Sequence, residues 1–117
     1  MRSSPKNSFL DEVGPNISLK EKFGRSKIEE LRKYSDPEAV AQKAQQLGLN
    51  PVHESSRKDK KYMVFDGNKM VHFGQMGYQD YTKHGDQARR DRFRKRNHRW
   101  ATAPRCSPAW LSWTLLW

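Results

Sequence analysis

Hydrophobic and polar residues alternate with a period of two on both sides of Asp66-Gly67-Asn68. Such alternation predicts two β-strands, and the Asp-Gly-Asn sequence supplies the tight turn of a hairpin near residues 60–74. One strand face carries the predicted core residues Tyr62, Val64, Val71 and Phe73. The other face is also partly apolar, with Met63, Phe65, Met70 and His72. We therefore expect both faces to be covered, one by a preceding helix and the other by later residues.

A helical pattern precedes the hairpin. The sequence SDPE combines a polar cap, proline at the first helical position and glutamate in the first turn. Apolar residues then recur at helical spacing, at Val40, Ala44 and Leu47. Gly48 is a typical stop, so a helix is predicted over residues 37–47 and placed on one face of the hairpin. Residues 53–61, HESSRKDKK, are polar and are expected to form a connecting loop.

The first third of the chain shows no sustained period. Residues 1–17 are interrupted by proline and glycine and predict an extended arm. This arm is either a disordered tail or a strap that lies in a neighbouring subunit's groove. Two Ser-x-x-Glu capping boxes, at Ser18 and Ser26, then predict a short helical turn and a helix near 27–34. We divide the chain into an arm with short helices, 1–35, and a small basic α+β domain, 36–117.

An arginine-rich helix is predicted over residues 87–99, with Asp86 as its cap. Phe93 and Trp100 are seven residues apart and are expected to reach the hairpin. Seven cations within eleven residues surround most of this helix: Arg89, Arg90, Arg92, Arg94, Lys95, Arg96 and Arg99. Like charges one helical turn apart destabilise a helix. We therefore expect this run to contact a polyanionic or acidic partner; the alternative is a solvated face that maintains solubility.

The chain ends in an uncharged segment, SPAWLSWTLLW. Ser107-Pro108 is typical of a cap followed by a first helical residue. Three of the four tryptophans follow, at Trp110, Trp113 and Trp117. We expect the tail to close the protein's own core, with Trp110 and Trp113 against the hairpin and residues 115–117 either helical or extended. Docking into a neighbouring protein and anchoring at a membrane surface are the alternatives.

Composition limits the core and locates the charge. Hydrophobic residues make up 34% of the chain, which favours a small core over a full one. The net charge is +10: residues 1–56 hold 9 basic and 8 acidic side chains, and residues 57–117 hold 14 and 5. A basic partner surface is therefore expected in the second half, for nucleic acid, anionic membrane or acidic protein.

Candidate chemistry is sparse. The four histidines and Cys106 show no spacing typical of a zinc site, and the dispersed aspartates suggest no catalytic pair. We expect no enzyme, no metal and no cofactor. A single cysteine excludes an internal disulfide and suits a reducing compartment. The chain's start does not resemble a secretory signal, and no apolar stretch is long enough to span a membrane.

Sequence motifs of the second half resemble those of a known family. KKYMV, VHFG and GYQDYT are followed by RRDRFRKRNHRW and by the SPAWLSWTLLW ending. In this order, over residues 57–117, they resemble a family of small basic proteins encoded by the large nucleocytoplasmic DNA viruses, the phycodnavirus, iridovirus and mimivirus groups. The resemblance implies a virion protein, assembled in the host cytoplasm or nucleus, with no reaction attached to it.

Two functions are compatible with these features. The first is a minor capsid protein, a cement or scaffold that ties coat subunits together in a large icosahedral DNA virus. Its partners would be the major and other minor capsid proteins, and its arm would contact neighbouring subunits. The second is a sequence-independent viral DNA-binding or packaging protein. A single-strand binder needs exposed aromatics between its cations, and Phe93 and Trp100 are too few and have core-like spacing, so duplex binding is the version retained. The arm, the small core and the basic surface favour the capsid role.

Overall fold

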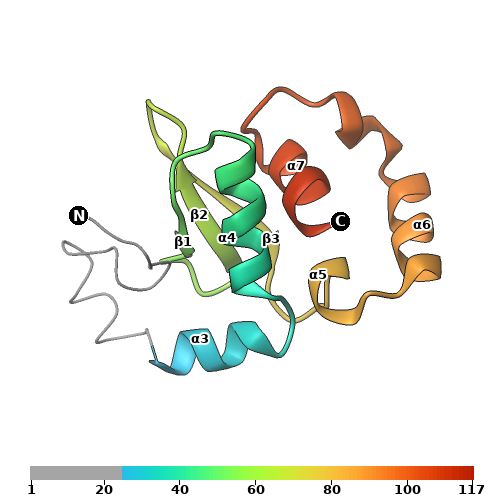
Figure 1. Ribbon diagram of the computed structural model, residues 1–117, viewed down its shortest axis with the longest axis horizontal. Helices are drawn as coiled ribbons and strands as arrows, with labels where there is room; N and C mark the ends of the chain where they lie inside the picture. Colours follow the sequence, from blue (N-terminus) through green and yellow to red (C-terminus); the bar gives the residue numbers. More distant parts are fainter. Residues whose placement is uncertain (1–24) are drawn as a thin grey trace.

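The computed structural model describes residues 25–117; the predicted arm and the helical turn after it lie outside these residues. The fold is α+β, with helices around a three-stranded antiparallel sheet of order β1-β2-β3 (Figure 1). The strands are β1 (Val52–Glu54), β2 (Lys60–Phe65) and β3 (Met70–Gln75). The helices are α3 (Arg25–Arg32), α4 (Pro37–Gln46), α5 (Tyr81–His84), α6 (Gln87–Arg96), η3 (His98–Thr102), α7 (Pro108–Leu111) and η4 (Ser112–Leu116).

In the hairpin Tyr62 pairs with Phe73 and Val64 with Val71. All four side chains are at most 5% exposed, which confirms the predicted core face. The prediction of a connecting loop over residues 53–61 is wrong at its start, because residues 53 and 54 belong to β1, which pairs with β2. Only Val52 of β1 is hydrophobic. A three-residue strand with one apolar side chain shows no alternation of hydrophobic and polar residues from which a strand could be predicted.

Helix α4 forms where the sequence predicts it. The Asp36 side chain accepts a hydrogen bond from the Ala39 amide, 3.2 Å away, and Pro37 is the first helical residue. At the other end Gly48 has a φ of +76°, and the amide of Leu49 donates to the carbonyl of Ala44 at 3.0 Å. This pattern is a Schellman cap, which needs the left-handed glycine and turns Leu49 back toward the core.

Helix α3 begins at Arg25, before the cap predicted at Ser26. Its Leu31 is fully buried in the same core as α4 and the sheet. Lys27 joins the helix to the sheet by donating to the Lys60 carbonyl at 2.7 Å. The predicted domain boundary at residue 35 therefore cuts through one continuous core.

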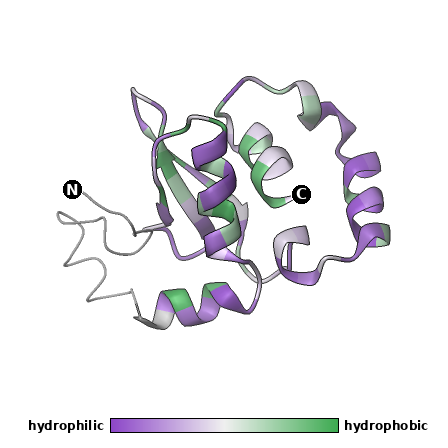
Figure 2. Ribbon diagram, in the orientation of Figure 1, coloured by the Kyte–Doolittle hydropathy of each residue, from purple (hydrophilic) through white to green (hydrophobic). Residues whose placement is uncertain are grey.

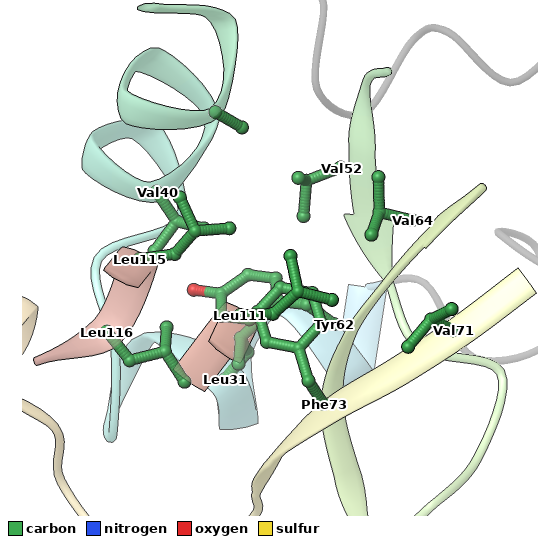
Figure 3. Close-up of a cluster of buried hydrophobic side chains, with 11 residues drawn as sticks. Leu31, Val40, Val52, Tyr62, Val64, Val71, Phe73, Leu111, Leu115 and Leu116 are labelled. Atoms are coloured by element: carbon green, nitrogen blue, oxygen red, sulfur yellow. The ribbon is translucent and has the colours of Figure 1, made fainter. Parts of the chain in front are cut away.

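The C-terminal segment packs into the protein's own core. Leu111, Leu115 and Leu116 are at most 1% exposed, and Figure 3 shows them converging with side chains of α4 and the sheet around Tyr62. Ser107 caps α7 by accepting from the Trp110 amide at 3.2 Å, as predicted. The last turn is π-helical rather than extended, since the Trp117 amide donates to the Ser112 carbonyl at 3.2 Å.

The tail's leucines occupy the buried positions that we predicted for tryptophans. Trp110 and Trp117 pack at the edge of the core, and Trp113 is half-buried. The correction has a geometric reason, because the leucines share the helix face toward the sheet. Gly74 of β3 allows this approach: a Cβ there would lie 2.9 Å from Leu116 Cδ1.

The tail's leucines and helix α4 share the core with the strand face that carries Tyr62 and Phe73. On the second face Met63 is buried. Phe65 and Met70, which pair at the hairpin tip, remain 44% and 40% exposed. The hairpin tip therefore presents an apolar pair at the surface of the described region.

A buried ion pair joins β2 to the loop after β3. Lys61 Nζ lies 2.9 Å from Asp80 Oδ2, and the two side chains are 3% and 1% exposed. The ammonium also donates to the Tyr78 carbonyl at 2.7 Å and to the Tyr34 carbonyl at 3.4 Å. Burial lowers the pKa of Lys61, and the Asp80 carboxylate opposes that shift.

A hydrogen-bonded chain extends from this pair into the core. The Thr82 hydroxyl donates to Asp80 Oδ1 and lies 3.2 Å from the Ser35 hydroxyl. The Tyr62 hydroxyl donates to Ser35 at 2.6 Å, and the Asp36 amide donates to Thr82 at 3.0 Å. The network thus ties β2, the α3–α4 link and the start of α5 into one unit.

We predict that Leu115→Ala lowers the free energy of unfolding by about 2–5 kcal/mol, because it removes buried contacts and leaves a cavity. Leu47→Ala is the matched control: Leu47 is 37% exposed, so the same truncation should cost less than about 1 kcal/mol. Urea denaturation measures both. Equal losses would show that the tail does not contribute to the core.

We predict that Asp80→Asn and Lys61→Met each lower the free energy of unfolding by about 3–5 kcal/mol, because each leaves one buried charge without its counter-ion. The double variant should lose much less than the sum of the two, since it contains neither isolated charge. A double-mutant cycle measured by urea denaturation tests this coupling. Additive losses would mean that the pair contributes nothing beyond its separate side chains.

Candidate functional site

Helix α6 carries the strongest concentration of charge and is almost entirely hydrophilic (Figure 2). Asp86 caps it as predicted, with Oδ1 accepting from the amides of Ala88 at 3.0 Å and Arg89 at 3.2 Å. The helix ends at Arg96, earlier than the predicted residue 99, and the chain continues in the 3₁₀ turn η3. None of its residues is buried, so α6 is held by a few contacts of its larger side chains.

Aromatic stacking provides the main attachment of α6. The Phe93 ring lies 4.1 Å from the Trp117 ring at an interplanar angle of 5°. Trp100 meets Phe93 edge to face at 5.6 Å. Phe93 and Trp100 therefore pack on the tail and on each other, not on the hairpin as we expected. The tail is the surface that positions the charged helix.

Two of the seven cations face the tail. Arg90 Nε donates to the Trp117 carbonyl at 2.6 Å, and its guanidinium lies 4.9 Å from the Tyr81 ring centre. The Arg94 guanidinium lies 4.5 Å from the centre of Trp113. Burial and the nearby Arg90 charge lower the pKa of Arg94. These two arginines hold α6 in place.

The other five cations are exposed: Arg89, Arg92, Lys95, Arg96 and Arg99. Within residues 25–117 no ion pair or hydrogen bond engages the side chains of Arg89 and Arg92, and Arg96 lies only near the Phe93 ring, 5.9 Å from its centre. Their charge is therefore not neutralised by the described part of the protein. Repulsion within the row is the cost of this arrangement.

Three of the exposed arginines line a cleft of about 400 Å³. Arg89, Arg92 and Arg96 come from α6, Gln75 is the last residue of β3, and Tyr78 belongs to the loop that follows β3. Further lining residues are Lys61, Gly74, Gln79, Phe93, Trp100, Ser112, Leu116 and Trp117. None of these described lining residues is acidic. The cleft therefore combines a cationic wall with aromatic and amide groups.

Tyr78 is a site residue that the sequence analysis missed. It precedes α5, and the residue is 70% exposed. Gly74 and Gly77 precede it and are typical of a loop, but a loop pattern does not say which way the ring points. An exposed aromatic residue thus lines the same cleft as the exposed arginines.

The residues considered for catalysis lie apart. His72 Nδ1 is 2.7 Å from the Ser55 hydroxyl, which also accepts from the Arg57 amide at 2.9 Å. His84 Nδ1 accepts from the Asp86 amide at 2.8 Å. Among residues 25–117 no three histidine, cysteine, aspartate or glutamate side chains gather as metal ligands do. In the same region no helix is long and apolar enough to cross a membrane.

Comparison with known proteins gives one match. Residues 51–97 match the model of a family described as a family of unknown function, DUF5754. No curated protein and no solved structure matches the chain. The matched region contains the whole sheet, the Lys61–Asp80 pair and α6. The description of the family names no activity, so the match assigns none to this chain.

We predict that Arg90→Gln with Arg94→Gln lowers the free energy of unfolding by about 1–3 kcal/mol, because a charged hydrogen bond and a cation–π contact are lost. Arg89→Gln with Arg92→Gln removes the same charge from the exposed side and should change stability by less than about 0.5 kcal/mol. Urea denaturation of both double variants measures the difference. Equal effects would contradict the division of α6 into an inner and an outer side.

Proposed function

We propose that this protein is a non-enzymatic nucleic-acid-binding protein that contacts the phosphate backbone through the exposed cations of α6. The observation that carries the proposal is the cleft lined by Arg89, Arg92 and Arg96, with no acidic residue among its described lining residues. Guanidinium groups pair well with phosphate oxygens. An anionic partner also relieves the repulsion within the row, which gives binding a second source of favourable free energy.

The arrangement supports binding that does not depend on base sequence. Arg90 and Arg94 contact the tail and hold α6 in place. The exposed arginines extend from this helix, whose first turn is capped by Asp86. Long cationic side chains on one helix face match a repeating backbone charge, and phosphate contacts carry no direct sequence information. Charge neutralisation and release of counter-ions are therefore the expected driving forces.

A second candidate is the minor capsid role implied by the family resemblance. The observation that favours it is the exposed apolar pair Phe65 and Met70 at the hairpin tip, which suits contact with another protein. In Figure 1 the hairpin tip and α6 lie on opposite sides of the described region. A protein inside a virus particle could use one surface for coat protein and the other for the genome.

We predict that the protein binds labelled oligonucleotides of two unrelated sequences with similar affinity, and that the affinity falls steeply between about 0.05 and 0.2 M salt. Arg89→Gln with Arg92→Gln should weaken binding roughly tenfold or more. It should also lower the slope of log K against log salt by about two, because two phosphate contacts are lost. Fluorescence anisotropy at several salt concentrations measures both quantities.

The matched control is Lys58→Gln with Lys69→Gln, which removes two exposed charges that do not line this cleft. Each double variant lowers the net charge from +10 to +8, so an effect of net charge alone would weaken nucleic-acid binding by both variants equally. Selective loss in the α6 variant supports the proposal. Absence of binding by the wild-type protein, together with co-sedimentation with purified major capsid protein, would favour the second candidate.

A further inference from the structure

We infer that the cleft beside α6 binds single-stranded nucleic acid, with phosphates on the arginine row and an unpaired base stacked on Tyr78. The inference rests on the proposed nucleic-acid binding and names the form of nucleic acid that the site takes. Nonspecific single-strand sites combine a cationic groove with aromatic side chains on which bases stack. The cleft brings both elements together in about 400 Å³, a volume suited to a small organic group.

The arginine row matches the backbone of one strand. Arg89, Arg92 and Arg96 are three and four residues apart, so they recur on one side of α6 and span about 10 Å along its axis. A stacked strand rises about 3.4 Å per nucleotide, so this row faces about three phosphates. Lys95 and Arg99 are exposed but do not line the cleft. They extend the positive field around the site without entering it.

Tyr78 is held in position while its ring stays accessible. Its carbonyl accepts from the buried Lys61 ammonium at 2.7 Å, and the next residue, Gln79, donates to the Lys33 carbonyl at 3.3 Å. Asp80 is fixed by the ion pair with Lys61. The backbone on one side of Tyr78 is therefore anchored to the core, yet 70% of its side chain is exposed. Little ordering is needed before a base stacks on this ring.

An unpaired base fits this arrangement better than a duplex does. In a duplex the faces of the bases are covered by their neighbours, so an aromatic ring beside the backbone has no base face to contact. A single strand exposes those faces while presenting the same phosphates. Tyr78, which lines the same cleft as the arginine row, thus adds a contact that only an unpaired strand can make. DNA and RNA strands share this chemistry.

The test uses Tyr78→Leu, which keeps an apolar side chain but removes the ring, and Tyr78→Phe as the matched control. Anisotropy is measured with labelled oligo-dT, oligo-U and a duplex of equal length. We expect Tyr78→Leu to weaken binding of the single strands about fivefold to a hundredfold, while Tyr78→Phe retains it and duplex affinity changes little. Cross-linking of an oligonucleotide containing 5-iodouracil should label the peptide that contains Tyr78.

The outcomes separate this inference from the proposal on which it rests. If Tyr78→Leu binds oligo-dT and oligo-U as the wild type does, and the cross-link lies elsewhere, single-strand stacking is wrong. The proposed nucleic-acid binding still stands in that case if Arg89→Gln with Arg92→Gln weakens binding. If the arginine variant also binds normally, both ideas fail. Thermal denaturation of each variant shows whether lost binding reflects an unfolded protein.

Discussion

The rest of the structure depends on a charge that is removed from water. Lys61 lies on a central strand, and its ammonium is buried with only Asp80 and two carbonyl groups to replace the lost hydration. A buried ammonium without such partners would cost several kcal/mol. The chain must therefore bring the loop after β3 back across β2 and hold the α3–α4 link beside it. The start of α5, and through it the position of α6, follows from this requirement.

The KKYMV and GYQDYT motifs gain a structural explanation from this constraint. Lys61 of the first motif pairs with Asp80 of the second. Tyr62 of the first motif is linked through the Ser35 hydroxyl to Thr82 of the second, which in turn donates to Asp80. These polar residues lie in a buried, hydrogen-bonded network and are not poised for chemistry. Tyr78 is the exception, because it shares the second motif yet points to the surface. One short segment thus supplies both the core and the proposed site.

Local signals in the sequence predicted local structure well. Asp36, Pro37 and Gly48 bound α4, Asp86 begins α6, and the hairpin alternation gives the buried face, because each depends on neighbours within a few residues. Contacts between distant segments were not readable. The Lys61–Asp80 pair spans 19 residues and has no periodic pattern. The tail's leucines rather than its tryptophans enter the core, and Tyr78 is exposed, because packing from several elements decides which side chain fits.

The arginine row was identified from the sequence, but its division into two sides was not. Spacing alone treats Arg90 and Arg92 as equivalent, and only the docked tail distinguishes them. The residues that line the cleft include Leu116 and Trp117, which belong to the segment that completes the hydrophobic core. A ligand in the cleft would therefore bind the folded chain more tightly than the unfolded one. By linkage such a ligand would raise the melting temperature, so the bound ligand and the hydrophobic core would stabilise each other.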